Sequence, residues 1–347
     1  MEQYLENPWR GRGLNGFDLL PLSNPQEVAH LLQRCPAHAP TPLRNLPDLA
    51  AHFGIAQLWL KDERARMGLG SFKALGAAYA IARAAAATQA DDLSQALRGH
   101  VYVTASAGNH GMSVAAGARL FGARAVIVLA DTVPEAFATR LRAKGAEVMR
   151  AGQDYDASMK AAEQAARDKG WTLLSDSSWP GYTDLPLRVM EGYLQLAAEA
   201  AEQIDQPPTH ILLQAGVGGL AAAVAAHARQ VWGDGPQIIV VEPDAAPALI
   251  SAIRAGMLVD ADGPVSCMGR LDCKTASMIA LAGLARDADA FVTILDAQAE
   301  DAVALLAAHD LPTTPSGAAG VGALLAGLRL SAQARVMVIL SEGPEGG

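Results

Sequence analysis

From residue 101 onward the sequence alternates short apolar runs with longer alanine-rich segments, and this alternation restricts the possible folds most. Apolar runs of four or five residues bounded by glycine or polar residues are typical of buried strands, and longer periodic segments between them are typical of helices. Strands are predicted at 101–104, 125–129, 147–150, 172–174, 210–213, 238–241, 291–295 and 336–340. The alternation predicts an α/β protein built on parallel sheets.

The rest of the chain divides this α/β protein into two parts. A further strand is predicted at 57–61, residues 1–24 form an irregular leader, and the polar segment 87–99 crosses between the parts. Helices are predicted at 25–34, 46–53, 74–87, 134–143, 157–169, 185–204, 218–232, 246–255, 299–309 and 317–328, with another ending near Phe121. We expect two three-layer domains, a small one of residues 91–180 inserted into a large one of residues 1–90 and 181–347.

Composition excludes several classes of function. The chain has 347 residues, 51% of them hydrophobic, and 27 basic against 36 acidic side chains, with no basic run. Nucleic acid and anionic membranes are therefore not expected partners. No signal peptide or bilayer-length apolar stretch is visible, so a cytoplasmic protein is expected. Cys35, Cys267 and Cys273 are irregularly spaced, which predicts neither a disulfide framework nor a metal site.

A lysine flanked by glycines lies where strand 57–61 gives way to an apolar helix. Lys73 stands in the stretch Gly68-Leu69-Gly70-Ser71-Phe72-Lys73-Ala74-Leu75-Gly76, at the start of that helix. Burial and the positive end of the helix dipole are both expected to lower the pKa of its amine, which favours the neutral form that attacks an aldehyde. Taken by itself, the stretch favours a lysine whose ammonium group reaches solvent, and the neutral amine is favoured only together with the rest of the chain.

Three other stretches also follow strands. Ser106 to Gly111 and Gln214 to Leu220 each bring backbone N–H groups to the start of a helix, where a carboxylate or phosphate can bind, although the first is also compatible with an ordinary N-cap. Residues 214–220 lack the dinucleotide fingerprint and the P-loop lysine, which favours a simple phosphate. Residues 340–343 present a serine at the end of the last strand. Ligand sites of open parallel sheets lie at such strand ends, so the four stretches are expected to share one crevice.

Together these stretches resemble those of the fold type II pyridoxal-5′-phosphate enzymes, the tryptophan synthase β superfamily. Within that superfamily the diaminopropionate ammonia-lyases are the most similar group, and the resemblance runs from about residue 10 to the C-terminus. It is carried by Leu58 to Glu63, Gly70 to Gly76, Gly108 to Gly111, Asp176 to Thr183, Thr209 to Gly219, and Val241 to Asp244.

The resemblance implies pyridoxal 5′-phosphate as cofactor and a homodimer as the assembly. It implies that Lys73 forms the Schiff base, that Asn109 bonds the cofactor's 3′-oxygen, and that Ser341 faces the pyridine nitrogen. The phosphate would lie against Gly216, Val217, Gly218 and Gly219, and the substrate carboxylate against Ser106, Ala107, Gly108 and His110. A neutral hydroxyl at the ring nitrogen does not hold it protonated, which suits β-elimination.

Two departures from the family pattern bear on the substrate. Ammonia-lyases of this group carry an aspartate on each face of the substrate; here the first position is Ala107 and the second is Asp176. Because alanine takes no proton, we expect action on one enantiomer, the L form, with Asp176 as the acid and base. The alternative role for Asp176 is a polar cap after strand 172–174. Pro315 stands where the group has an acidic residue, so no side chain is expected there for the substrate's distal group.

The expected function is a pyridoxal-phosphate-dependent ammonia-lyase that eliminates the β-substituent of an L-amino acid. The best candidate reaction converts 2,3-diaminopropionate to pyruvate and ammonia. Asp176 and the Trp179 region favour an amine as the leaving group, whereas Ala107 and Pro315 leave a hydroxyl open, as in a serine, threonine, hydroxyaspartate or phenylserine dehydratase. A β-replacement synthase and a catalytically silent protein that holds the cofactor are the remaining alternatives.

Overall fold

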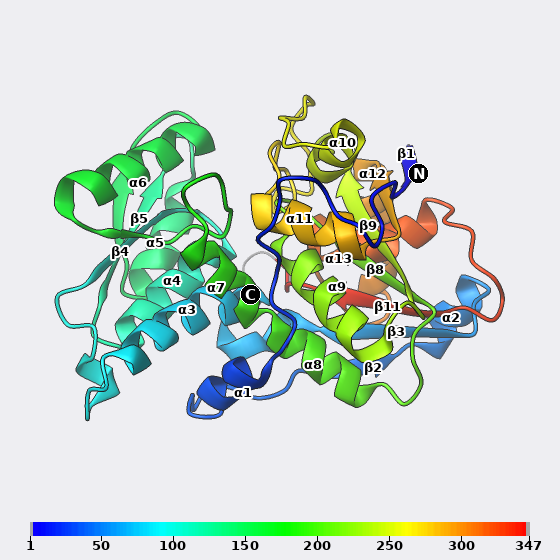
Figure 1. Cartoon of the computed structure of the whole chain (residues 1–347), viewed down its shortest axis with the longest axis horizontal. Coiled ribbons are helices and arrows are strands. Elements are labelled where there is room, and N and C mark those ends of the chain that lie inside the picture. The colour runs from blue at the N-terminus through cyan, green and yellow to red at the C-terminus, as the bar shows by residue number, and fades with distance from the viewer. Residues whose placement is uncertain (1–2, 345–347) are drawn as a thin grey trace.

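The computed structural model describes residues 3–344 and contains two separate sheets packed against helices (Figure 1). The seven-stranded sheet has the order β1-β10-β9-β8-β11-β3-β2, and the four-stranded sheet has the order β6-β5-β4-β7. All neighbouring strands of the small sheet are parallel, and in the large sheet only the two edge strands, β1 and β2, run antiparallel. The prediction of an α/β fold with two parallel sheets is confirmed.

The strands agree closely with the apolar runs of the sequence. They are β1 Gln3–Glu6, β2 Leu43–Asn45, β3 Gln57–Asp62, β4 Val101–Ala105, β5 Arg124–Leu129, β6 Glu147–Arg150, β7 Thr172–Leu173, β8 His210–Gln214, β9 Gln237–Pro243, β10 Ala290–Ile294 and β11 Arg335–Leu340. The prediction of an irregular leader was wrong in one part, because the leader contains strand β1, which pairs with β10 of the large sheet. Short edge strands such as β1 and β2 lack a long apolar run, so sequence pattern did not reveal them.

The helices surround both sheets. They are α1 Gln26–Leu32, α2 Pro47–His52, α3 Lys73–Ala87, α4 Asn109–Leu120, α5 Glu135–Ala143, α6 Tyr155–Lys169, α7 Asp184–Gly192, α8 Leu194–Gln203, α9 Gly219–Trp232, α10 Ala248–Ala255, α11 Met278–Asp287, α12 Asp296–Ala307 and α13 Pro315–Leu325, with short 3-10 helices η1 Glu63–Gly68 and η2 Leu93–Gln95. Helix α11 was not predicted from the sequence. It is almost wholly buried, and a helix that is apolar over most of its length has no amphipathic pattern.

The long helix predicted at 185–204 is in fact two helices that meet at Tyr193. At this point α7 approaches α3 so closely that a Cβ on Gly192 would lie 2.5 Å from the carbonyl oxygen of Leu75. Only glycine permits this approach, and Tyr193, whose backbone stays helical with a φ of −70° and a ψ of −14°, joins α7 to α8. Tyr193 lies beside the start of α3, with its ring centroid 4.9 Å from that of Phe72, the residue before Lys73.

The two sheets are not consecutive in the chain. All four strands of the small sheet come from residues 101–173, and the large sheet takes strands from before and after that range. In Figure 1 the small sheet with α5 and α6 lies to one side, and α3, α4 and α7 lie between it and the large sheet. The domain bounds 1–90 with 181–347, and 91–180, stay a prediction, and their first two and last three residues lie outside the described part of the chain. Among residues 3–344 no helix is long and apolar enough to cross a membrane.

Candidate active site

Lys73 and Asp176 form an ion pair between the two sheets. Lys73 is the first residue of α3, Asp176 lies in the loop that follows β7, and the Nζ atom donates to Oδ2. Burial is the largest single effect and lowers the pKa of the lysine amine, but Asp176, Tyr193 and Cys273 together raise it by more, so the net pKa lies above the ordinary value. The expectation of a neutral amine was therefore wrong for this state of the site, because sequence alone did not place a carboxylate against it.

The same ion pair keeps Asp176 charged. Burial by itself raises the pKa of this carboxyl group, but the Lys73 ammonium, through its charge and its hydrogen bond, lowers it to well below its usual range. The proton of the pair consequently resides on Nζ, and Asp176 is an ionised carboxylate at neutral pH. An ionised carboxylate held in a largely buried position is suited to accept a proton from a bound molecule.

The loop from Ser106 to His110 joins β4 to α4. The amide of Gly108 donates to Ser106 Oγ at 3.3 Å, and Asn109 and His110 form the first turn of α4. His110 Nε2 donates to the carbonyl oxygen of Leu174 at 2.8 Å, while its Nδ1 has no hydrogen-bond partner among residues 3–344. Burial lowers the pKa of this imidazole, so it is neutral. Ala107 is half-buried in the same loop and offers no ionisable group.

The glycine loop between β8 and α9 is shaped for close approach of the backbone. A Cβ on Gly216 would lie 3.0 Å from both the Cys273 sulfur and the Leu271 Cα, and Gly218 has a φ of 98°. The first amides of the helix that follows have no intrahelical acceptor. A Cβ on Gly219 would lie 4.0 Å from the carbonyl oxygen of Asp176, so this cradle adjoins the ion pair.

Ser341 connects the last strand to the lysine loop. Its carbonyl oxygen accepts the amide of Phe72 at 3.0 Å, and the next residue, Glu342, forms a β-bridge with Ser71. Ser341 is buried and lies one residue beyond the end of β11. The structure thus brings all four stretches singled out in the sequence to one region between the sheets, while the individual roles assigned to their residues stay predictions.

Two charged residues without a predicted role also belong to this region. The Glu342 carboxylate accepts hydrogen bonds from Asn109 Nδ2 and Thr314 Oγ1, and its Oε2 lies 3.7 Å from Arg270 Nε. A cavity of about 280 Å³ is lined by Cys267, Gly269, Arg270, Thr313, Thr314, Pro315, Ser316 and Glu342. Because of Pro315, no side chain was expected there for the substrate's distal group; in the structure, Glu342 reaches the same cavity from another element. The only feature of the sequence that pointed to Glu342 was its position directly after Ser341.

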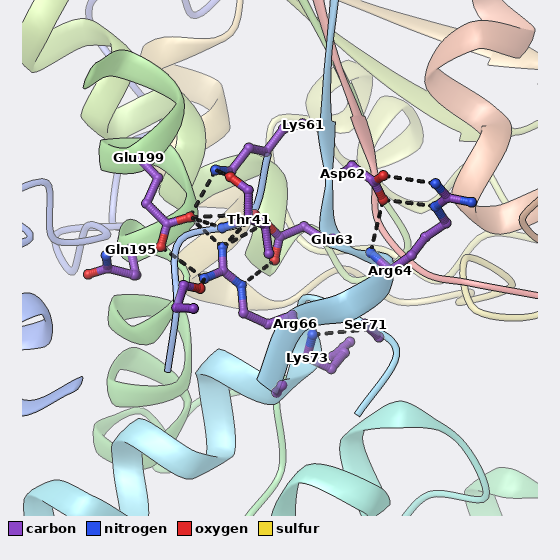
Figure 2. Close-up of polar contacts among 12 residues, drawn as sticks. Thr41, Lys61, Asp62, Glu63, Arg64, Arg66, Ser71, Lys73, Gln195 and Glu199 are labelled. Carbon is purple, nitrogen blue, oxygen red and sulfur yellow. Dashed lines mark hydrogen bonds and ion pairs between the residues drawn. The ribbon is translucent and has the colours of Figure 1, made fainter. Parts of the chain in front are cut away.

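A buried network of charges lies behind the lysine loop (Figure 2). Arg66 donates to Glu63 and to Glu199, each at 2.7 Å, and Lys61 Nζ donates to Glu199 at 2.8 Å. Thr41 donates to Glu63 at 2.5 Å and accepts from Arg66 at 2.9 Å. Two cations balance two carboxylates, and the side chains of Arg66, Glu63 and Lys61 are wholly buried. The network connects β3 and η1, which precede Lys73 in the chain, to helix α8.

Replacement of Glu199 by alanine is expected to destabilise the protein by about 3–5 kcal/mol, because it leaves two buried cations with one carboxylate. Urea denaturation of both proteins measures the difference. The matched control is Glu202→Ala, an exposed residue of the same helix, which should change the free energy of unfolding by less than about 0.5 kcal/mol. Similar losses in the two variants would contradict the importance of the network.

The same carboxylate predicts an acid limit of stability. Burial raises the pKa of Glu199, but Arg66 and Lys61 lower it by more, to about 2 from an ordinary 4.5. The unfolded chain then binds a proton at Glu199 more readily than the folded chain does. The stability that this carboxylate contributes is therefore fully present above pH 4.5 and is lost as the pH falls toward 2. Urea midpoints measured across that range should fall less steeply in Glu199→Ala than in the wild type.

Comparison with known proteins assigns this arrangement to a large group. A family model described as "Pyridoxal-phosphate dependent enzyme" matches residues 35–342. Diaminopropionate ammonia-lyase of Salmonella typhimurium is 33% identical over 91% of this chain and 88% of its own length. Human L-serine dehydratase/L-threonine deaminase is 32% identical over 71% of this chain and 70% of its own length.

Solved structures agree with the sequence comparison. The holo form of diaminopropionate ammonia lyase from Escherichia coli superposes with a TM-score of 0.89 at 30% identity, over 98% of this chain and 93% of that one. The similarity therefore extends across both sheets and is not limited to the lysine loop.

Proposed function

The chain belongs to the pyridoxal-phosphate dependent enzymes, and on that premise we propose that it is an ammonia-lyase that removes the β-substituent of an L-amino acid. The preferred substrate is 2,3-diaminopropionate, which is converted to pyruvate and ammonia. The observation that carries the proposal is the contact of Lys73 with an ionised Asp176 beside a glycine cradle, in a chain similar over nine-tenths of its length to a diaminopropionate ammonia-lyase.

The residues present fit the family's cofactor. A Cβ on Gly216 would fill the space against Cys273, so the loop from Gly216 to Gly219 can bring its amides close to a phosphate. Lys73 supplies the amine that can bond the cofactor's aldehyde, and Asn109 and Ser341 lie beside it on α4 and after β11. When bound, pyridoxal phosphate supplies an aldehyde that forms a Schiff base and a ring that stabilises negative charge at the substrate's Cα.

The chain's own residues account for the proton transfers of elimination. Amides at the start of α4, in the loop from Ser106 to His110, hold the substrate carboxylate. Asp176 is charged and accepts the proton from Cα. A side-chain ammonium then leaves as ammonia without a further proton, whereas a hydroxyl leaves as water with the proton that the same carboxyl group can return. Lys73 Nζ, in contact with Asp176, holds a proton that can be exchanged with that carboxylate. His110 is neutral and adds no competing charge.

A β-hydroxy amino acid dehydratase is the second candidate. The observation that favours it is the pair of hydroxyl oxygens of Thr313 and Thr314 in the cavity beside Pro315, which can accept a hydrogen bond from a hydroxyl as well as from an amine. The similarity to a mammalian serine dehydratase supports it too, over a smaller part of the chain.

A substrate panel separates these candidates. Cofactor-loaded protein is incubated with L-2,3-diaminopropionate, L-serine, L-threonine, hydroxyaspartate and phenylserine, and ammonia and 2-oxo acid are measured. The proposal predicts the highest kcat/KM with L-2,3-diaminopropionate. A higher kcat/KM with any hydroxy substrate supports the dehydratase, and the absence of ammonia from every substrate contradicts both.

The enzyme is expected to discriminate between enantiomers, because, of positions 107 and 176, only the second carries a carboxylate, Asp176. We expect kcat/KM for L-2,3-diaminopropionate to exceed that for the D form by about 10²-fold or more. Ammonia release from each pure enantiomer measures the ratio. Ala107→Asp restores a carboxylate in the half-buried loop position and should raise turnover of the D form, whereas equal turnover of both forms by the wild type would contradict the assignment.

We also propose a cytoplasmic homodimer. The large exposed apolar side chains of Met257 and Tyr4 support an assembly, since they flank the contact between Arg254 of α10 and Gln3 of β1. Sedimentation of the purified protein tests the dimer, and fractionation of the producing cells tests the location.

A further inference from the structure

We infer that Glu342 determines the preference for an amine over a hydroxyl at the substrate's β-carbon, with Arg270 as its charged neighbour. This inference rests on the proposed function and names the residue that selects the leaving group. No carboxylate was expected in this part of the site, because Pro315 occupies the position at which an acidic residue was anticipated.

The Glu342 side chain is held in one position. It is 4% exposed, and its two carboxylate oxygens accept hydrogen bonds from different elements, Asn109 at the start of α4 and Thr314 before α13. Its backbone carbonyl accepts Thr313 Oγ1 at 2.6 Å. Both of these side-chain donors are neutral, and the positive charge beside the carboxylate is that of Arg270, whose Nε lies 3.7 Å from Oε2.

Arg270 is held next to both Glu342 and the substrate loop. Its amide donates to Ser316 Oγ at 3.0 Å, and its Nε lies 3.7 Å from Glu342 Oε2. A Cβ on Gly108 would lie 3.4 Å from the same Nε, so the guanidinium packs over the loop assigned to the substrate carboxylate. A Cβ on Gly216 would also lie 3.2 Å from the carbonyl oxygen of Arg270, so Arg270 adjoins the glycine loop as well.

The two charged residues line two cavities. Besides the cavity of about 280 Å³ beside Pro315, both residues line a second cavity of about 500 Å³ that reaches Gly70, Asn109 and the exposed residues Arg140 and Ala143 of α5. A small amino acid entering between the sheets therefore meets a guanidinium and a carboxylate beside the loop that begins α4.

The Arg270 guanidinium and the Glu342 carboxylate side by side match one class of substrate. A 2,3-diamino acid carries a carboxylate, which suits Arg270 and the amides near Gly108, and a side-chain ammonium, which suits Glu342. Serine and threonine carry a neutral hydroxyl and gain much less from a fixed carboxylate. A charged hydrogen bond of this kind corresponds to a difference of about 10- to 100-fold in kcat/KM.

The test compares the wild type with Glu342→Gln, which keeps the size of the side chain and an acceptor for Asn109. The measured quantity is the ratio of kcat/KM for L-2,3-diaminopropionate to that for L-serine. We expect the ratio to fall by about 10- to 100-fold, mainly through the KM for the diamino acid. If L-serine binds without turnover, its inhibition constant replaces its kcat/KM in the ratio.

Several controls separate selection of the substrate from a structural role. Glu202→Gln, an exposed residue of α8, should keep the wild-type ratio. If Glu342 only orients Asn109, the absorbance band of the bound cofactor shifts and both substrates lose equally, which overturns the inference. Thr314→Val removes one donor to the carboxylate and should lower the ratio in the same direction, so that a poorly folded Glu342→Gln does not leave the question open.

The outcomes also separate this inference from the proposed function. A wild type that releases no ammonia from L-2,3-diaminopropionate contradicts the proposed function and the inference together. A wild type that does so, but whose ratio is unchanged in both Glu342→Gln and Thr314→Val, overturns the inference alone.

Discussion

Lys73→Ala is expected to lower ammonia release by about 10⁴-fold or more with every substrate, the largest effect of any single substitution in this chain. The amine is the only group at the start of α3 that can bond an aldehyde, and it contacts Asp176. Ammonia and 2-oxo acid are measured with wild type and variant at saturating cofactor. Borohydride reduction followed by peptide mass spectrometry should place the cofactor on Lys73 in the wild type and on no lysine in the variant.

The matched control is Lys160→Ala, an exposed lysine of α6, which should retain wild-type turnover. A reduced cofactor attached to Lys61 would contradict the assignment, because that lysine is wholly buried in the charge network behind the loop. Turnover by Lys73→Ala within tenfold of the wild type would contradict the proposed function itself.

Asp176→Asn is expected to lower kcat/KM by about 10²- to 10⁴-fold, because an amide cannot accept the proton from Cα. The same substitution removes the carboxylate that raises the pKa of the Lys73 amine. Burial, the largest single effect, is then opposed only by Tyr193 and Cys273, so the pKa of Lys73 falls. The dependence of kcat/KM on pH, measured with L-2,3-diaminopropionate, should therefore change at its alkaline end, because the lower pKa of Lys73 brings the titration of its amine closer to neutral pH.

Asp168→Asn is the control for this change, since Asp168 is exposed near the end of α6 and lies outside the site. It should leave both kcat/KM and its pH dependence as in the wild type. If Asp176 were only a polar cap after β7, Asp176→Asn would reduce the free energy of unfolding while leaving the pH dependence of kcat/KM unchanged.

Much of the fold could be predicted from sequence because its strands are short, apolar and bounded by glycine or polar residues. The β8 strand and its glycine loop illustrate this, since the run His210–Gln214 and the glycines after it both depend on local chemistry. Strand β1 and helix α11 could not be predicted in this way. The first is a short edge strand whose partner lies almost 290 residues away, and the second is apolar on all sides.

The sequence by itself determined where backbone amides can approach an anion and which lysine begins a buried helix, because glycine spacing and helix boundaries are local properties. Only the tertiary structure decided the charge of that lysine and the identity of its neighbours. Asp176 lies 103 residues from Lys73, and Glu342 lies 233 residues from Asn109. Electrostatic effects depend on distance in space, so the pKa of Lys73 and the carboxylate beside Pro315 followed from the packing of the two sheets.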